Sequence, residues 1–207
     1  MTREEKQQIK AKEKEYKELI KNVGRKYGMQ HKLCSLFFCQ KNYFIDIIYD
    51  FNASNNKFMY RAGIKYLDYD DIQWDVLEMS DNKNEPLSLR AVGAFSAGGT
   101  HFIENTVVPL GNEPEAVIDN ILAEIKKKAE AYEEDLDEKI ISEVGEKEED
   151  KMEAVTGLFI VYIHMKKFAE ARDLIEKCLK NGYEGSYGNN GKSFVELALE
   201  YLNKNNL

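Results

Sequence analysis

Residues 33–67 constrain the fold most strongly, because they contain three runs rich in aromatic and β-branched residues. The runs are separated by Lys41-Asn42 and by the polar segment at residues 52–56. Apolar runs of strand length with turn residues between them are typical of antiparallel strands joined by hairpins. We therefore expect three consecutive strands in this stretch.

Alternation in the second and third runs predicts one apolar sheet face and one mixed face. The apolar face would hold Tyr43, Ile45, Ile47, Tyr49, Phe51, Phe58, Tyr60, Ala62, Ile64 and Tyr66. The other face carries Asp46, Asp50, Arg61 and Lys65, which we interpret as a partner-binding surface. Trp74, the only tryptophan, would extend this surface if exposed, because aromatic residues dominate binding hot spots; otherwise it packs a helix on the sheet.

The spacing of apolar residues on both sides of residues 33–67 predicts helices and two further strands. We expect a helix over 2–27, a short helix after Asp68, strands over 87–95 and 101–108, and a closing helix. Asn112 and Glu115 suggest a capping box for that helix, with Pro114 in its first turn. The closing helix either continues past Asp135 or breaks near it, and the helical pattern ends at Gly145.

These elements give an α+β fold for residues 1–136, with the order α-β-β-β-α-β-β-α and an antiparallel sheet backed by helices. Residues 137–207 are predicted to form a helical extension. Within it, helical runs cover 152–165 and 168–179, and a last helix starts at Ser193 with Glu196 completing a capping box.

The order of elements over residues 2–135 resembles that of type III secretion chaperones and of a related bacterial family of sensory-transduction regulators. The best local matches are FMYRAGIKYL and GGTHFIENTVVPLGNEPEAVIDNIL. This resemblance implies a protein without catalytic residues that forms a homodimer and binds polypeptide segments.

The run AVTGLFIVYIHMKKFAEARDLIEKCLKNG is similar to one tetratricopeptide repeat, with Leu158 and Tyr162 at large-residue positions. Phe159 departs from the pattern because a small residue is usual there, and Tyr183 stands where proline is frequent. One repeat cannot bury both of its faces, so it must pack on the neighbouring helices.

Composition narrows the classes of partner. A formal net charge of −8 argues against nucleic-acid binding, which needs clusters of Lys and Arg. We expect no membrane span, no secretory signal and, with three cysteines, no disulfide framework, so the predicted location is cytoplasmic. Residues 112–150 contain fifteen Asp/Glu and five Lys/Arg, a surface that could steer a basic partner.

Two motifs resemble a cofactor-binding and a metal-binding sequence, but we assign neither function to them. The sequence Gly191-Lys192-Ser193 resembles the end of a phosphate-binding loop, but Ser186 stands where a glycine is required and no strand precedes it. We therefore predict a turn with an N-cap. His31, Cys34 and Cys39 do not have zinc-ligand spacing, and we predict buried free thiols.

Four aspartates, at positions 68, 70, 71 and 75, are interpreted as helix-capping and solvated residues, with a cation site left open. His101 is the best candidate for a general base, but nothing near it in sequence supplies a nucleophile. We therefore predict no catalytic, cofactor-binding or metal-binding residues.

The main functional hypothesis is a non-enzymatic, chaperone-like or regulatory module that binds a protein or peptide. A first alternative is an acidic, immunity- or antitoxin-like inhibitor of a basic toxin, whose binding would weaken with salt. A second alternative is a hydrolase that uses His101 and the aspartates at 68–75.

Overall fold

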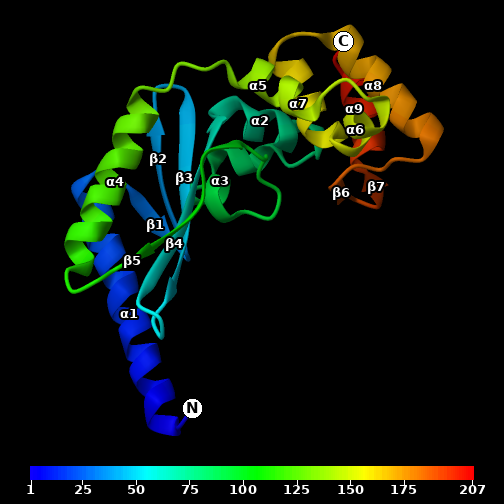
Figure 1. Cartoon of the computed structure of the whole chain (residues 1–207). Coiled ribbons are helices and arrows are strands. Elements are labelled where there is room, and N and C mark those ends of the chain that lie inside the picture. Colours follow the sequence, from blue (N-terminus) through cyan, green and yellow to red (C-terminus); the bar gives the residue numbers. More distant parts are fainter. The chain divides into compact units, whose positions relative to one another are not determined.

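The computed structural model describes residues 1–207, and they form two compact units (Figure 1). The first unit contains residues 1–64 and 101–133, and the second contains residues 65–100 and 134–207. Residues 65–100 thus belong to the same compact unit as the C-terminal helices. The sequence predicts a boundary between two folding domains at 136/137. The division into compact units does not decide where folding domains begin and end, so that boundary stays a prediction.

The first unit is built around a five-stranded antiparallel sheet with the strand order β1-β2-β3-β4-β5. Its elements are α1 (Arg3–Lys26), β1 (Gln30–Lys32), β2 (Ser35–Gln40), β3 (Tyr43–Asn52), β4 (Lys57–Tyr66), β5 (Thr100–Pro109) and α4 (Pro114–Glu130). The predicted α+β class, the antiparallel sheet and the C-terminal helical region are therefore confirmed.

Two tight hairpins set the register of the central strands. Lys41 adopts a positive φ of 57° in the turn between β2 and β3, where Gln40 pairs with Tyr43. Leu36 lies opposite Ile47 and Phe38 opposite Ile45, so these apolar side chains share one sheet face. The predicted turn at 41–42 is confirmed.

Asn56 fixes the second hairpin, between β3 and β4. Its φ of 52° is in the left-handed region, which asparagine tolerates well. Its side-chain oxygen accepts a hydrogen bond from the Tyr16 hydroxyl of α1, and its Nδ2 donates to the Gly111 carbonyl at 2.9 Å. Its own carbonyl accepts from the Leu110 N–H at 2.9 Å. One turn residue therefore connects α1, the β3–β4 hairpin and the end of β5.

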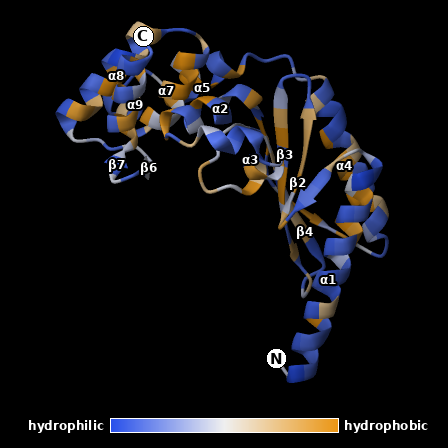
Figure 2. Ribbon diagram, turned by 180° about the vertical axis from the view of Figure 1, so that it is seen from behind, coloured by the Kyte–Doolittle hydropathy of each residue, from blue (hydrophilic) through white to orange (hydrophobic).

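Helices α1 and α4 lie next to each other and bury apolar stripes. Lys26 Nζ of α1 is 2.9 Å from Glu115 Oε1 of α4, and the Tyr27 hydroxyl donates to the Asp119 carbonyl. A side chain at Gly24 would place its Cβ 2.8 Å from Leu36 Cδ2, so glycine allows α1 to approach β2 closely. The first half of α1 is mostly hydrophilic (Figure 2) and begins at a Thr2–Glu5 capping box.

The predicted apolar sheet face is confirmed for its central residues, because Ile45, Ile47, Phe58 and Ile64 are all buried. The opposite face is mixed, as predicted. Asp50 and Ile48 are exposed there, whereas Phe44 is fully buried and stacks on Phe37 with ring centroids 5.9 Å apart.

The predicted strand over 87–95 is wrong. Residues 88–92 form a short helix, α3 (Ser88–Val92), and β1 supplies the fifth strand instead. The Pro86 carbonyl accepts from the Leu89 N–H at 2.8 Å and opens this helical turn. Arg90 then reaches Leu67 and two aspartates. These contacts outweigh the weak strand propensity of the run.

The closing helix is only partly as predicted. Pro114 occupies the first turn of α4, but Glu113 is the N-cap and no side chain caps the helix, so the Asn112–Glu115 capping box is wrong. The chain does break near Asp135, whose carboxylate accepts from the Asp137 N–H at 2.9 Å and starts the next helix. Gly145, with a φ of 79°, ends that helix.

The second unit is almost entirely helical. It contains α2 (Leu67–Val76), the 3₁₀ helix η1 (Ser80–Asn84), α3, α5 (Leu136–Val144), α6 (Glu148–Glu153), α7 (Val155–His164), α8 (Phe168–Asn181), the two-stranded hairpin β6 (Gly188–Asn189) and β7 (Lys192–Ser193), and α9 (Phe194–Lys204).

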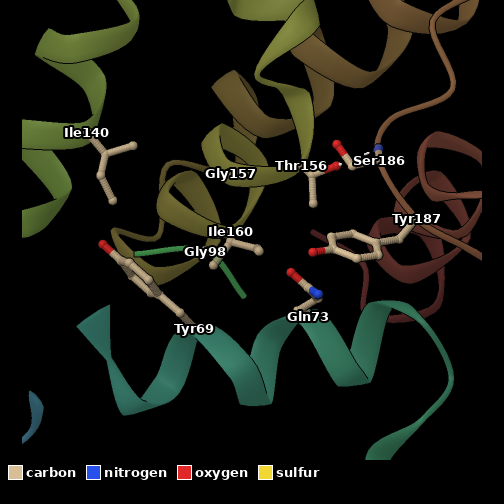
Figure 3. Close-up of a pocket in the computed structure, with 9 residues that line it drawn as sticks. All are labelled: Tyr69, Gln73, Gly98, Ile140, Thr156, Gly157, Ile160, Ser186 and Tyr187. Carbon is tan, nitrogen blue, oxygen red and sulfur yellow. Dashed lines mark hydrogen bonds between the residues drawn. The ribbon is translucent and has the colours of Figure 1, made fainter. Parts of the chain in front are cut away.

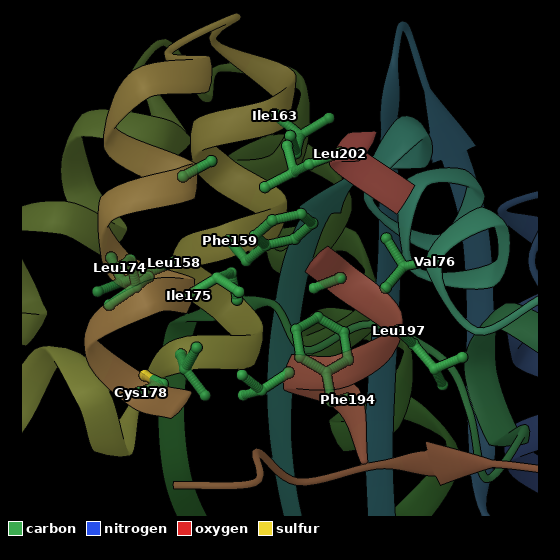
Figure 4. Close-up of a cluster of buried hydrophobic side chains, with 14 of the residues drawn as sticks. Val76, Leu158, Phe159, Ile163, Leu174, Ile175, Cys178, Phe194, Leu197 and Leu202 are labelled. Carbon is green, nitrogen blue, oxygen red and sulfur yellow. The ribbon is translucent and has the colours of Figure 1, made fainter. Parts of the chain in front are cut away.

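One apolar cluster joins α2, α7, α8 and α9 (Figure 4). Phe159 of α7 is fully buried and meets the Phe194 ring of α9 edge-on, with centroids 5.8 Å apart. Val76 and Leu77, at the end of α2, join the same cluster. The two predicted helices of the repeat-like hairpin and the Ser193–Glu196 capping box are confirmed, and α9 covers the hairpin.

Candidate functional site

The five residues predicted as a partner surface lie in different environments. Asp50 is exposed, and Asp46 and Arg61 are partly exposed, on β3 and β4 of the first unit. Lys65 and Trp74 are only 5% and 1% exposed. The prediction of an exposed partner surface is therefore wrong for Lys65, and Trp74 follows its alternative prediction as a packing residue, so neither side chain contacts a partner in this conformation.

Lys65 is buried at the centre of a network of charged and polar groups in the second unit. Its Nζ donates to Asp70 Oδ1 at 2.8 Å and to the carbonyls of Arg90 and Ala97 at 3.0 and 2.9 Å. Asp70, which is 0% exposed, also accepts from the Ala97 N–H at 2.8 Å. Each buried charge thus has several partners, which is what makes its burial tolerable.

Arg90 completes this network from α3. Its guanidinium nitrogens lie 3.3 Å from Asp70 Oδ2 and 2.6 Å from Asp71 Oδ1. The guanidinium carbon, Cζ, is 4.8 Å from the centre of the Trp74 ring. The Trp74 Nε1–H donates to the Phe95 carbonyl at 2.8 Å. Trp74 is therefore a packing residue between α2 and the α3 segment.

The predicted aspartate cluster does not converge on one point. Asp70 and Asp71 bind the cations just described, and Asp75 accepts from Lys83 and Ser80 at 2.6 and 2.8 Å. The prediction that aspartates cap the short helix is wrong, because α2 begins at Leu67 without a side-chain cap. No group of three or more His, Cys, Asp or Glu side chains in residues 1–207 could hold a metal ion.

A second polar cluster joins α2, α5 and α7. Asp137 accepts from the Tyr69 hydroxyl at 2.7 Å and lies 2.8 Å from His164 Nδ1. The His164 ring stacks on Tyr66 with centroids 4.7 Å apart. The hydrogen bond to Asp137 raises the pKa of His164, while burial opposes this shift. Burial and the bond to Asp137 also raise the pKa of Tyr69.

The free energy of unfolding is expected to fall as pH rises through the His164 titration. The pKa of His164 is raised in the folded state above its ordinary value of 6.5, so its stabilisation is complete below that value and is lost as pH passes the folded pKa. Urea denaturation at a series of pH values should show this slope in the wild type and a flatter one in His164→Gln. A steeper slope in the variant would contradict the assignment.

A pocket of about 200 Å³ opens beside this cluster, within the second unit. Its lining residues come from α2, α5, α7 and two loops: Tyr69, Gln73, Gly98, Ile140, Thr156, Gly157, Ile160, Ser186 and Tyr187 (Figure 3). None of these side chains is charged. Gln73 is 0% exposed, and its Oε1 is the one buried side-chain oxygen or nitrogen in residues 1–207 without a hydrogen-bond partner.

The remaining sequence candidates do not line this pocket. His101 is exposed on β5 in the first unit. Gly191-Lys192-Ser193 lies at the β6–β7 hairpin, where Lys192 pairs with Glu200 at 2.6 Å and Ser193 caps α9, so the predicted turn and N-cap are confirmed. His31 Nε2 lies 2.7 Å from the Tyr49 hydroxyl.

Two of the three cysteines differ from their prediction. Cys34 and Cys39 are exposed: Cys34 follows Leu33 in the tight β1–β2 turn, and Cys39 lies near the end of β2. Cys178 is fully buried in α8.

Cys178 is expected to resist thiol reagents. Burial raises the pKa of its thiol from 9.0 to about 11, which leaves about a hundredfold less of the reactive thiolate near neutral pH. Titration with a chromogenic disulfide should report two fast thiols in the folded protein and a third only in denaturant. A Cys34→Ser/Cys39→Ser variant should show no fast phase, and three fast thiols in the wild type would contradict this expectation.

Many carboxylates of the acidic 112–150 segment are paired. Glu115 and Asp119 lie near Lys26, Glu124 near Lys128, Glu134 near Lys139 and Glu148 near Lys177. These pairs are solvent-exposed and stabilise little individually, but they reduce the field that the segment presents to a basic partner.

Sequence reasoning missed Gln73, Gly157 and Tyr187. Gln73 stands between the apolar residues Ile72 and Trp74, which was a usable signal, because buried polar side chains need partners. The contribution of Tyr187 depends on the course of a loop and had no local signal.

No helix combines the length and the apolar character needed to cross a bilayer. Comparisons with protein families, with curated proteins and with solved structures find no match to this chain.

Proposed function

We propose that the chain is a non-catalytic protein that binds a polypeptide, and that the partner adds as a strand along β5. The observation that carries this proposal is the position of β5. It is a ten-residue strand at the edge of the sheet, with β4 as its only strand neighbour. The opposite edge, β1, has only three residues.

The chemistry of β5 supports strand addition. The outer side of an edge strand presents backbone N–H and C=O groups that an extended peptide can pair with, while side chains provide specificity. Exposed and half-buried residues alternate along the second half of β5, and Val107 is 55% exposed. A peptide would gain apolar contact there in addition to backbone hydrogen bonds. A second copy of the chain could pair in the same way and form a homodimer.

The test is selection of ten-residue peptides from a random displayed library, followed by amide hydrogen exchange of the complex. We expect alternate amides between residues 100 and 109 to become protected, because N–H groups of successive residues point to opposite sides of a strand. Protection confined to other elements would contradict the proposal.

Proline scanning supplies a matched control. Asn105→Pro and Thr106→Pro remove adjacent N–H groups, one directed to β4 and the other outward. We expect one variant to unpair β5 and the other to keep the fold but weaken peptide binding about tenfold or more. Asn105→Ala and Thr106→Ala keep both N–H groups and should bind normally. Equal binding by all folded variants would count against strand addition.

A further inference from the structure

The pocket beside α2 combines an uncharged lining with one unsatisfied polar atom, Gln73 Oε1. Figure 3 shows the Gln73 amide and the hydroxyl end of the Tyr187 ring directed into the same space, with Ile160 of α7 beside them. Ile140 of α5 faces the space from the far side.

The orientation of the Gln73 amide follows from its neighbour. Its Nε2 donates to the Phe95 carbonyl at 3.0 Å. The reversed orientation would place two acceptor oxygens against each other, so Oε1 is the end of the amide that turns away from Phe95, and Figure 3 shows it on the pocket side. The Phe95 carbonyl also accepts from Trp74 Nε1 at 2.8 Å and would stay satisfied without Gln73. An apolar residue at position 73 would therefore leave no group without a partner, whereas glutamine leaves one.

Three other polar groups of the lining have partners within the protein, whereas the Ser186 hydroxyl belongs to an exposed residue. The Tyr69 hydroxyl donates to Asp137 at 2.7 Å, the Thr156 hydroxyl accepts from the Ser186 N–H at 3.2 Å, and the Tyr187 hydroxyl is 3.4 Å from the Ser96 carbonyl. Gln73 Oε1 is therefore the one buried polar atom of the lining without a partner, and a donor on the occupant would satisfy it. The lining offers no cation to an anionic ligand.

The size of the pocket limits the occupant. An engineered apolar cavity of about 150 Å³ in another protein binds benzene, so a pocket of about 200 Å³ suits one or two fused rings. Gly98 and Gly157 keep this space open, because a Cβ at either position would have no atom within 4 Å.

We propose that this pocket binds a small neutral molecule with an apolar ring and a single N–H or O–H group that donates to Gln73 Oε1. The site is separate from β5 and does not depend on the proposed polypeptide binding. The ring would pack against Ile140, Ile160 and the Tyr187 ring, and Gln73 would select for the donor.

Indole and 1-methylindole test the donor requirement, because they share a shape and only indole has an N–H. Titration of the full chain, followed by the backbone amide signals of Gly98 and Tyr187, should show saturable binding of indole and binding of 1-methylindole about tenfold weaker. Phenol and anisole form a second pair with an O–H donor and should differ in the same direction. Equal affinities within both pairs, or no saturable shift with either indole or phenol, would overturn the proposal.

Two glycine variants test the location. Gly157→Ala and Gly157→Leu improve helix propensity to a similar degree, but only leucine fills the pocket. We expect indole binding to survive in Gly157→Ala and to be lost in Gly157→Leu, and unchanged binding in the leucine variant would refute the site. Gln73→Met should bind indole and 1-methylindole alike, while retained discrimination between them would also refute it. The ligand comparisons on the wild type do not depend on any variant folding.

Discussion

Replacing Asp70 by asparagine is expected to lower the free energy of unfolding of the second unit by about 3–5 kcal/mol. Asp70 is fully buried between Lys65 and Arg90, so the substitution leaves two buried or partly buried cations without their counter-charge. Trp74, the only tryptophan, lies in the same unit and packs on Arg90, so its fluorescence during urea denaturation reports this change directly.

Asp71→Asn is the matched control. Asp71 pairs with the same Arg90 but its side chain is 35% exposed, so the loss should be about 1 kcal/mol or less. Equal destabilisation by the two variants would show that burial does not decide the strength of this network. A Lys65→Met/Asp70→Leu double variant should not recover stability, because the Arg90 and Ala97 carbonyls and the Ala97 N–H would lose their partners.

Phe159→Ala is expected to destabilise the second unit by about 3–5 kcal/mol, the usual cost of deleting a buried phenylalanine ring. Phe159 fills the space between the α7–α8 hairpin and α9, where it meets Phe194 and, at 6.4 Å, the Tyr201 ring. A small residue is usual at this position in tetratricopeptide repeats. Here α9 packs on the hairpin through the large ring, so alanine would leave a cavity.

Leu179→Ala, in α8 of the same hairpin, controls for general effects of truncation. Leu179 is 41% exposed, and its removal should change stability by about 0.5 kcal/mol or less. Denaturation followed by Trp74 fluorescence measures both variants. A loss below about 1 kcal/mol for Phe159→Ala would mean that α9 is not held through this ring.

The strands and helices that carry a clear period were predictable from the sequence. Alternation over Tyr43–Tyr66 identified two strands and their buried face, and Ser193 with Glu196 identified the start of α9. The strand prediction for residues 87–95 was wrong because the apolar alternation there is short. The conformation there is decided by Arg90, whose partners lie about 20 residues earlier.

Burial of Lys65 could not be predicted for a similar reason. In the sequence it is one polar residue of an alternating strand, like Arg61, and only the folded chain brings Asp70 and the Ala97 carbonyl to its ammonium group. Gln73 was closer to being predictable, since it lies between the apolar residues Ile72 and Trp74. Its unsatisfied oxygen, however, depends on which nearby carbonyl takes its N–H group.

The division of the chain into interleaved units has a consequence for how the protein can be made and cut. Neither unit is a continuous piece of polypeptide, because the chain passes between them near residues 64, 100 and 133. A growing chain therefore cannot complete the first sheet until β5 has left the ribosome, by which time residues 65–100 have emerged without the helices that bury Val76 and Leu77. A fragment that ends at residue 136 keeps the sheet but leaves this apolar surface uncovered, so no single cleavage yields two intact halves.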